Sequence, residues 1–249
     1  MRPVWKTTGG LALGGLAVLA WWWQVTKVDR LIPVALAGAI PSETRQLVLV
    51  LAQGIDAVPA GVILLARDHA GKRWRIQAGP FPANLGRNGV GWGRDGSGLP
   101  NPGSYPDKKE GDGRSPAGVF RLPYAFGTEP QAPAGVKLSW LVCTSTLRGV
   151  DDAKSKYYNQ IVDEASIPDK DWESAEIMRR DDGAYETGLL IDHNADRIAG
   201  GGSCIFLHLW KGPGHGTAGC TALAREDVRK ILSWLDPAAE PRLVLGVAP

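Results

Sequence analysis

The sequence has no large excess of either charge. Its 28 Lys and Arg residues nearly balance 26 Asp and Glu residues, which leaves a formal net charge of +2 at pH 7 over 249 residues. A nucleic-acid-binding protein usually carries a strongly basic surface. The composition gives no argument for such a surface, so we expect no nucleic acid among the partners.

Cysteine is also scarce, and repeats are missing. Three cysteines are too few for a disulfide scaffold and leave at least one thiol unpaired. We find no internal repeat and no low-complexity tail. The chain therefore depends on a hydrophobic core of its own, for which 249 residues with 44% hydrophobic content are sufficient. We expect a monomer without a cofactor.

Glycine and proline, in contrast, are abundant. The 32 glycines and 18 prolines divide the chain into short segments, which favours β structure with many turns. Apolar or alternating runs predict strands at residues 46–51, 61–67, 73–77, 137–146, 188–192 and 242–247, and a further strand that begins after a turn at Pro116 and Gly118. Apolar positions at helical spacing predict one closing helix over residues 228–235. The predicted fold class is mainly β with a C-terminal helix.

Two long segments break this pattern. Residues 84–113 are rich in glycine, proline and charge, and predict an irregular loop of a length that is often functional. Residues 151–182 are polar and charged, and we interpret them as an irregular or partly helical excursion that covers the site.

The N-terminus carries an apolar run of 18 residues at positions 9–26, preceded by Arg2 and Lys6. This length just suffices to cross a bilayer, and the preceding positive charge predicts that the rest of the chain is exported. We favour an uncleaved membrane anchor over a signal peptide cleaved near residues 35–37. The predicted organisation is an anchor or signal at 1–30, a linker at 31–43 and a catalytic domain at 44–249, on the periplasmic or outer side of the membrane.

The candidate chemistry lies near the C-terminus. Cys220 follows Gly219, and His208 lies twelve residues upstream at the end of a predicted strand. A nearby imidazole raises the thiolate population of a cysteine, and the N–H groups of Gly219 and Cys220 would stabilise an oxyanion. The alternative from these residues alone is a buried cysteine beside a hydrogen-bonded histidine.

A zinc site built from Cys204, His208, His215 and Cys220 is the rival interpretation. On a strand, Cys204 and His208 would lie roughly 13 Å apart, too far for two ligands of one zinc ion. We therefore expect no metal.

Residues 205–208 (Ile-Phe-Leu-His) and 217–220 (Thr-Ala-Gly-Cys) resemble the signature of the YkuD-type L,D-transpeptidases. In that family a histidine closes a strand, and the nucleophilic cysteine follows a Ser/Thr-x-Gly turn. Residues 115–120 resemble an upstream element of the family. The likeness is greatest to an exported, largely uncharacterised branch, and further similar segments are residues 86–89, 109–113, 150–152, 158–159 and 202–208.

The resemblance implies a sandwich-like β fold and a cysteine acyltransferase that acts on peptidoglycan stem peptides. Cys220 would be the nucleophile and His208 the general base and acid. The oxyanion donors would be Gly219 and Cys220, and the substrate contacts would be Thr217, Trp210 and Tyr158. A nearby backbone carbonyl would orient His208.

The sequence also departs from the family pattern. Ala218 stands where the family usually has histidine, Ala222 stands where arginine or asparagine is usual, and the His-to-Cys gap is shorter. Two alternatives to transpeptidation therefore stay open: an L,D-carboxypeptidase or other amide hydrolase, and a non-catalytic module that binds the cell wall. With Cys220 as nucleophile, a Cys143–Cys204 disulfide is a further hypothesis.

Overall fold

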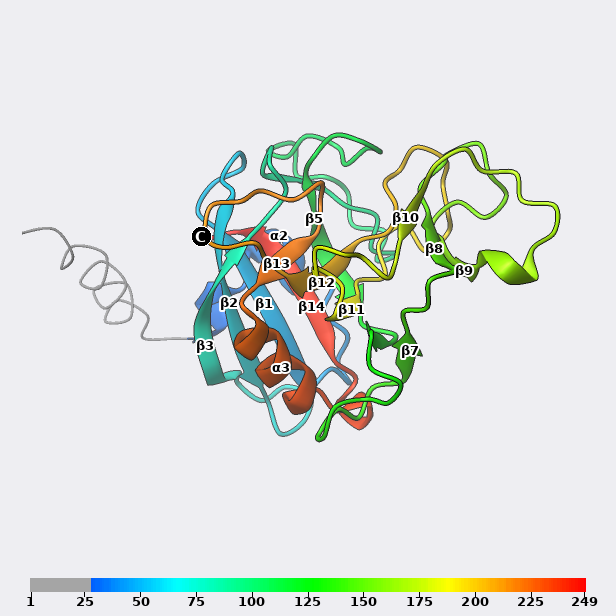
Figure 1. Ribbon diagram of the computed structural model, residues 1–249. Coiled ribbons are helices and arrows are strands. Elements are labelled where there is room, and N and C mark those ends of the chain that lie inside the picture. Colours follow the sequence, from blue (N-terminus) through cyan, green and yellow to red (C-terminus); the bar gives the residue numbers. More distant parts are fainter. Residues whose placement is uncertain (1–27) are drawn as a thin grey trace, which may run out of the picture.

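The computed structural model describes residues 28–249, and most of its regular structure is β (Figure 1). The strands are β1 (Gln46–Ala52), β2 (Pro59–Ala66), β3 (Arg75–Asn84), β4 (Val90–Trp92), β5 (Ser115–Arg121), β6 (Ala125–Gly127), β7 (Trp140–Val142), β8 (Leu147–Val150), β9 (Gln160–Asp163), β10 (Ala175–Ile177), β11 (Thr187–Leu190), β12 (Phe206–Leu209), β13 (Thr221–Leu223) and β14 (Arg242–Val247). The helices are α2 (Val34–Ala37) and α3 (Arg225–Trp234), with 3-10 helices η1 (Val28–Leu31), η2 (Glu164–Ser166) and η3 (Pro237–Ala239).

The predicted membrane segment at residues 9–26 lies outside the described residues. Within residues 28–249, no helix combines the length and the apolar character that a membrane crossing requires.

Eleven strands form one sheet in the order β4-β5-β14-β1-β2-β3-β13-β12-β11-β6-β7. The apolar runs at 46–51, 61–67 and 242–247 form strands as predicted, and they are neighbours in this sheet, with β1 antiparallel to β2 and parallel to β14. The last strand of the chain therefore lies beside the first, as the red and blue arrows of Figure 1 show. The run at 137–146 is predicted as one strand, but only its residues 140–142, strand β7, pair with a neighbouring strand, β6.

Three further strands form a separate small sheet in the order β10-β8-β9. They fall largely in the segment 151–182, where the only helix is the three-residue η2. The segment is largely irregular and contains one short 3-10 helix, as predicted, but β9 and β10 within it pair with β8, which the prediction did not include. Met178 of this segment belongs to the same hydrophobic cluster as Cys220.

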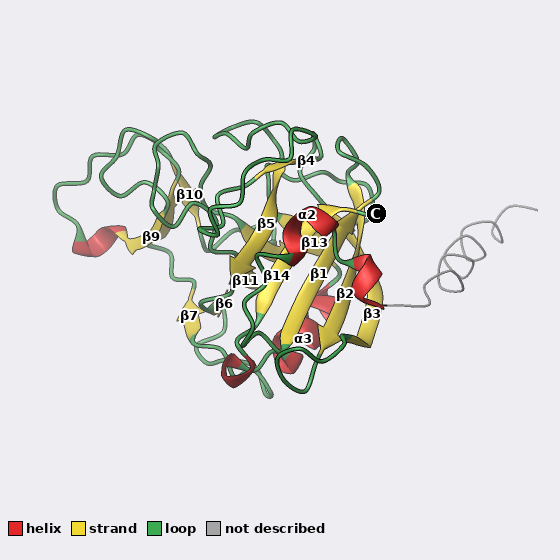
Figure 2. Cartoon of the chain, turned by 180° about the vertical axis from the view of Figure 1, so that it is seen from behind, coloured by secondary structure: helices red, strands yellow, loops and turns green. Residues whose placement is uncertain are grey.

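Residues 31–43, predicted as a linker, belong to the folded body. Leu31, Ile32 and Leu36 are buried in the main core, and α2 lies against the sheet (Figure 2). A Cβ atom at Gly246 of β14 would lie 2.9 Å from Pro33 Cγ, so this close approach requires glycine at that position. The linker prediction fails because the prolines of this stretch fix a packed turn and do not interrupt packing.

The predicted C-terminal helix is confirmed as α3, which begins three residues earlier than expected. Its buried side chains Val228, Ile231 and Leu232 face β11 and β12, as the helical spacing requires. Glu226 and Asp227 in the first turn complement the positive end of the helix dipole.

The buried side chains form two clusters. The larger, here called the main core, joins α2, α3 and the central strands around Leu49, Phe120 and Leu245. The smaller, here called the second core, consists of Phe126, Cys143, Leu147, Met178, Ala184, Tyr185, Cys204, Phe206 and Cys220. Strand β12 separates the two clusters, because Leu207 and Leu209 belong to the main core and Phe206 to the second core.

Candidate functional site

The structure brings Cys220 and His208 to neighbouring strands. Strand β12 is parallel to β13, with His208 paired to Ala222, and Cys220 directly precedes β13. Because side chains two residues apart share a face, Cys220 and His208 lie on one face of the sheet, one diagonal step apart. Strand spacing and rise place their Cα atoms roughly 8 Å apart.

The Cys220 thiol is enclosed. The residue is 5% exposed, and its Sγ accepts a hydrogen bond from the Phe206 N–H at 3.3 Å and donates to the Cys204 carbonyl at 3.6 Å. Burial raises the pKa of this thiol well above its ordinary range, and the nearby Glu176 carboxylate raises it further. Cys220 is therefore a neutral thiol at pH 7.

His208 is held in one tautomer. Its Nδ1 lies 2.8 Å from the Leu209 carbonyl oxygen, and because a carbonyl only accepts, Nδ1 carries the proton. Nε2 therefore keeps its lone pair. Burial lowers the pKa of His208 to about 4, so the ring is neutral at pH 7. The prediction that a backbone carbonyl orients this histidine is confirmed.

The two groups do not contact each other directly. Within residues 28–249, no hydrogen bond joins His208 to Cys220. The Tyr185 ring packs edge-on against His208 at 5.2 Å between centroids and against Phe206 at 5.3 Å. Tyr185 thus packs against two side chains of β12, the His208 imidazole and the ring of Phe206, whose backbone N–H contacts the thiol.

The turn before Cys220 is closed by Thr217. The Gly219 N–H donates to Thr217 Oγ1 at 3.1 Å, and that hydroxyl donates to the Cys220 carbonyl at 2.7 Å. A Cβ atom at Gly219 would lie 3.0 Å from the Arg114 carbonyl oxygen, so close packing explains the glycine. The predicted oxyanion donor Gly219 is therefore already engaged, and Thr217 builds the turn.

Two other predicted substrate contacts have structural roles in this state. Tyr158 is 3% exposed, and its hydroxyl donates to Glu110 Oε2 at 2.6 Å and accepts the Gly202 N–H at 3.0 Å. Trp210 is half-buried, and its backbone N–H pairs with the Leu223 carbonyl. Tyr158 consequently offers no free hydroxyl, whereas part of the Trp210 side chain is exposed.

Sequence reasoning missed Glu176 and Tyr185. Tyr185 donates its hydroxyl hydrogen bond to Glu176 Oε2, and burial raises the pKa of that carboxyl group. Glu176 lies on β10, in the segment predicted as irregular. Only the short alternation around this residue hinted at a strand, and nothing in the sequence indicated that it would meet Tyr185.

The three cysteines are free and buried, so the hypothesis of a Cys143–Cys204 disulfide is wrong in this structure. The Cys204 Sγ donates instead to the Val150 carbonyl at 3.8 Å, and burial raises the pKa of the Cys143 thiol to about 11. Both side chains serve as packing groups in the second core.

Over the described range, no three His, Cys, Asp or Glu side chains are grouped so that they would hold a metal ion. No protein-family model, curated protein or solved structure matches this chain.

Proposed function

We propose that this protein is a cysteine-dependent acyltransferase of the YkuD L,D-transpeptidase type, acting on peptidoglycan stem peptides. One observation carries the proposal. His208 keeps an Nε2 lone pair on the same sheet face as the Cys220 thiol, one diagonal step away on neighbouring strands. The proposal includes the sandwich-like catalytic fold of that family and an exported, membrane-tethered chain.

In the proposed reaction, His208 Nε2 takes the thiol proton, and the Cys220 sulfur attacks the carbonyl of the bond between the L-centre and the terminal D-residue. The imidazolium then gives its proton to the departing amine, and D-alanine leaves. The rest of the stem peptide stays bound to Cys220 as a thioester. An amine from a neighbouring stem attacks the thioester and restores the thiol. The Cys220 N–H stabilises the oxyanion, joined by the Gly219 N–H once Thr217 releases it.

This chemistry requires an opening of the second core. Cys220 is buried in one cluster with Leu147 and Met178, so in the proposal the segment carrying β8 and β10 moves before a peptide reaches the sulfur. Solvent access would also lower the thiol pKa, because burial is the largest cause of its elevation. Opening and activation of the nucleophile are thus one event in the proposal.

The enclosed thiol also favours a second candidate, a non-catalytic module that binds the cell wall. A neutral, 5% exposed cysteine is what a packing role would need, and Ala218 replaces the histidine usual in the family. A hydrolase differs from the transpeptidase only in the acceptor, with water attacking the thioester.

One experiment separates the three functions. The full-length chain is incubated with purified muropeptides, and the products are read by mass. Cross-linked dimers support the transpeptidase, and loss of D-alanine alone indicates the carboxypeptidase. The absence of both a product and a carbapenem adduct at Cys220 indicates the binding module. We expect Cys220→Ala to lower the rate of product formation at least about 10³-fold. Cys143→Ala is the matched control, because it removes a buried thiol from the same cluster. Activity that survives in Cys220→Ala contradicts the mechanism.

A further inference from the structure

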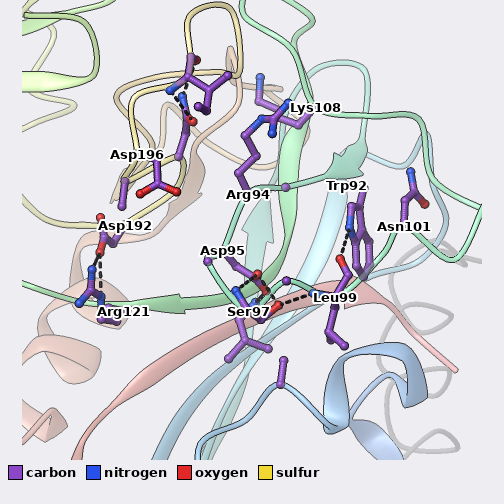
Figure 3. A pocket seen from close by; sticks show the side chains of 18 of the residues that line it. Trp92, Arg94, Asp95, Ser97, Leu99, Asn101, Lys108, Arg121, Asp192 and Asp196 are labelled. Carbon is purple, nitrogen blue, oxygen red and sulfur yellow. Dashed lines mark hydrogen bonds and ion pairs between the residues drawn. The ribbon is translucent and has the colours of Figure 1, made fainter.

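A pocket of about 830 Å³ opens away from the Cys220 site (Figure 3). Its walls come from the loop after β4, the end of β5 and the turn after β11, and neither Cys220 nor His208 lines it. Figure 3 shows Asp192 and Asp196 on one side, Arg94 and Lys108 next to one another in the view, and Trp92 on the far side.

Most charged groups of this pocket are already paired. Asp95 accepts hydrogen bonds from the backbone N–H groups of Ser97 and Val119, and Arg121 forms an ion pair of 2.8 Å with Asp192. Two groups remain. Across residues 28–249, the Arg94 guanidinium and the Asp196 carboxylate take part in no hydrogen bond or ion pair.

Lys108 adds a buried ammonium to the same wall. Its side chain is only 3% exposed, and Nζ donates to Asp112 Oδ1 and to the Lys109 carbonyl, both at 2.6 Å. An ammonium has three N–H donors, so one is still free. Its charge is paired with Asp112, and the spare N–H donor can bond a carboxylate oxygen at this wall.

Two adjacent glycines each lie close to one of the two cations. A Cβ atom at Gly201 would lie 3.0 Å from Arg94 Nε, and one at Gly202 would lie 3.3 Å from Lys108 Nζ. The guanidinium and the ammonium therefore lie against the same Gly-Gly step. Arginine binds carboxylates in a bidentate geometry, to which a neighbouring ammonium adds a point charge.

The backbone of this wall is held from behind by His193. Its Nδ1 accepts the Arg94 N–H at 3.2 Å, and Nε2 donates to the Gly201 carbonyl at 3.0 Å. Asn194 donates its backbone N–H to the Arg94 carbonyl at 2.8 Å. These buried groups fix the backbone that carries Arg94 before any ligand arrives, which lowers the entropic cost of binding.

We propose that this pocket binds a small zwitterion, a free amino acid or a short peptide, with its carboxylate on Arg94 and Lys108 and its ammonium on Asp196. The ligand meets the two unpaired charges and the spare lysine donor. Trp92 and Leu99 supply the apolar wall against its side chain. This site is separate from the proposed acyl transfer at Cys220.

The test is a titration of the ¹⁵N-labelled full-length protein, read at the Trp92 indole N–H and assigned with Trp92→Phe. The probes are glycylglycine, N-acetylglycine, which lacks the ammonium, and glycinamide, which lacks the carboxylate. We expect saturable binding of glycylglycine, with the other two probes at least about tenfold weaker. We expect Arg94→Gln to weaken glycylglycine at least about tenfold, while Arg73→Gln, an exposed arginine outside the pocket, leaves the Kd unchanged.

Asp196→Asn is a second, milder variant at an exposed position, and we expect it to weaken glycylglycine without changing N-acetylglycine. Three outcomes overturn the proposal: no saturable shift with glycylglycine, equal Kd values for Arg94→Gln and Arg73→Gln, or glycinamide binding as tightly as glycylglycine. Cys220→Ala should leave the Kd unchanged, so the fate of the acyltransferase proposal does not affect this result.

Discussion

The two faces of β12 share one backbone but contribute side chains to two different buried clusters. On one face, Leu207 and Leu209 join a main core whose buried members are almost all hydrocarbon. On the other, Phe206 joins a second core that contains all three cysteines and borders His208 and Glu176. The main core gives stability through area and close packing, whereas the second core encloses groups whose proton affinities burial has shifted. A mutation in each should therefore have a different signature.

Phe120→Ala should give the largest loss of stability. The side chain is fully buried in the main core, and its removal is expected to cost about 3–5 kcal/mol through lost transfer energy and a cavity. Urea denaturation measures this loss. Under native conditions the alkylation rate of Cys220 should stay at the wild-type value, because the second core is untouched. A large rise in that rate would mean that the two cores do not act separately.

Met178→Ala should loosen the second core. Met178 is fully buried in the same cluster as Cys220, so we expect a loss of about 2–4 kcal/mol together with faster alkylation of the thiol. The measurement is iodoacetamide labelling followed by peptide mass mapping, which distinguishes Cys220 from Cys143 and Cys204. The double variant with Cys220→Ala is the control for labelling at the other two thiols. Unchanged labelling of Cys220 would contradict the role of Met178 as its cover.

The particular elements explain what the sequence predicted and what it did not. Strands β1, β2 and β14 were found because continuous apolar runs mark buried strands whatever their partners. The Cys220–His208 pair was found because a glycine turn and a strand end lie close in sequence. The small sheet was missed because β8 to β10 are three or four residues long and only half apolar, so their pairing depends on tertiary contacts.

The sequence also did not show that the Tyr158 hydroxyl has a partner within the fold, or that residues 31–43 pack against the sheet. The family resemblance implies that Tyr158 contacts substrate, but the partner of its hydroxyl, Glu110, lies 48 positions away and no local pattern predicts that hydrogen bond. The packing of Leu36 likewise depends on Gly246, at the opposite end of the chain. Such long-range contacts carry no periodic signal.

Acidification should destabilise the protein through His208. Its folded pKa is about 4, below the ordinary 6.5, because burial disfavours the charged ring. The unfolded chain therefore binds the proton more tightly, and the contribution of this residue is complete above pH 6.5 and lost as pH falls towards 4. The loss amounts to at most about 3 kcal/mol. Denaturation of wild type and His208→Gln at several pH values measures it, and identical pH profiles would refute the assignment.

Tyr185→Phe isolates the smallest effect, one hydrogen bond in the second core. The ring keeps its edge contacts with His208 and Phe206, so packing is preserved, but Glu176 loses the donor of its partly buried carboxyl group. An unsatisfied buried acceptor costs about 1–3 kcal/mol. The double variant Tyr185→Phe, Glu176→Leu is the control, because removing both polar partners should recover much of this loss. A double variant no more stable than the single one would show that the Tyr185 hydroxyl has another partner, and the contrast between the two faces of β12 would then rest on packing alone.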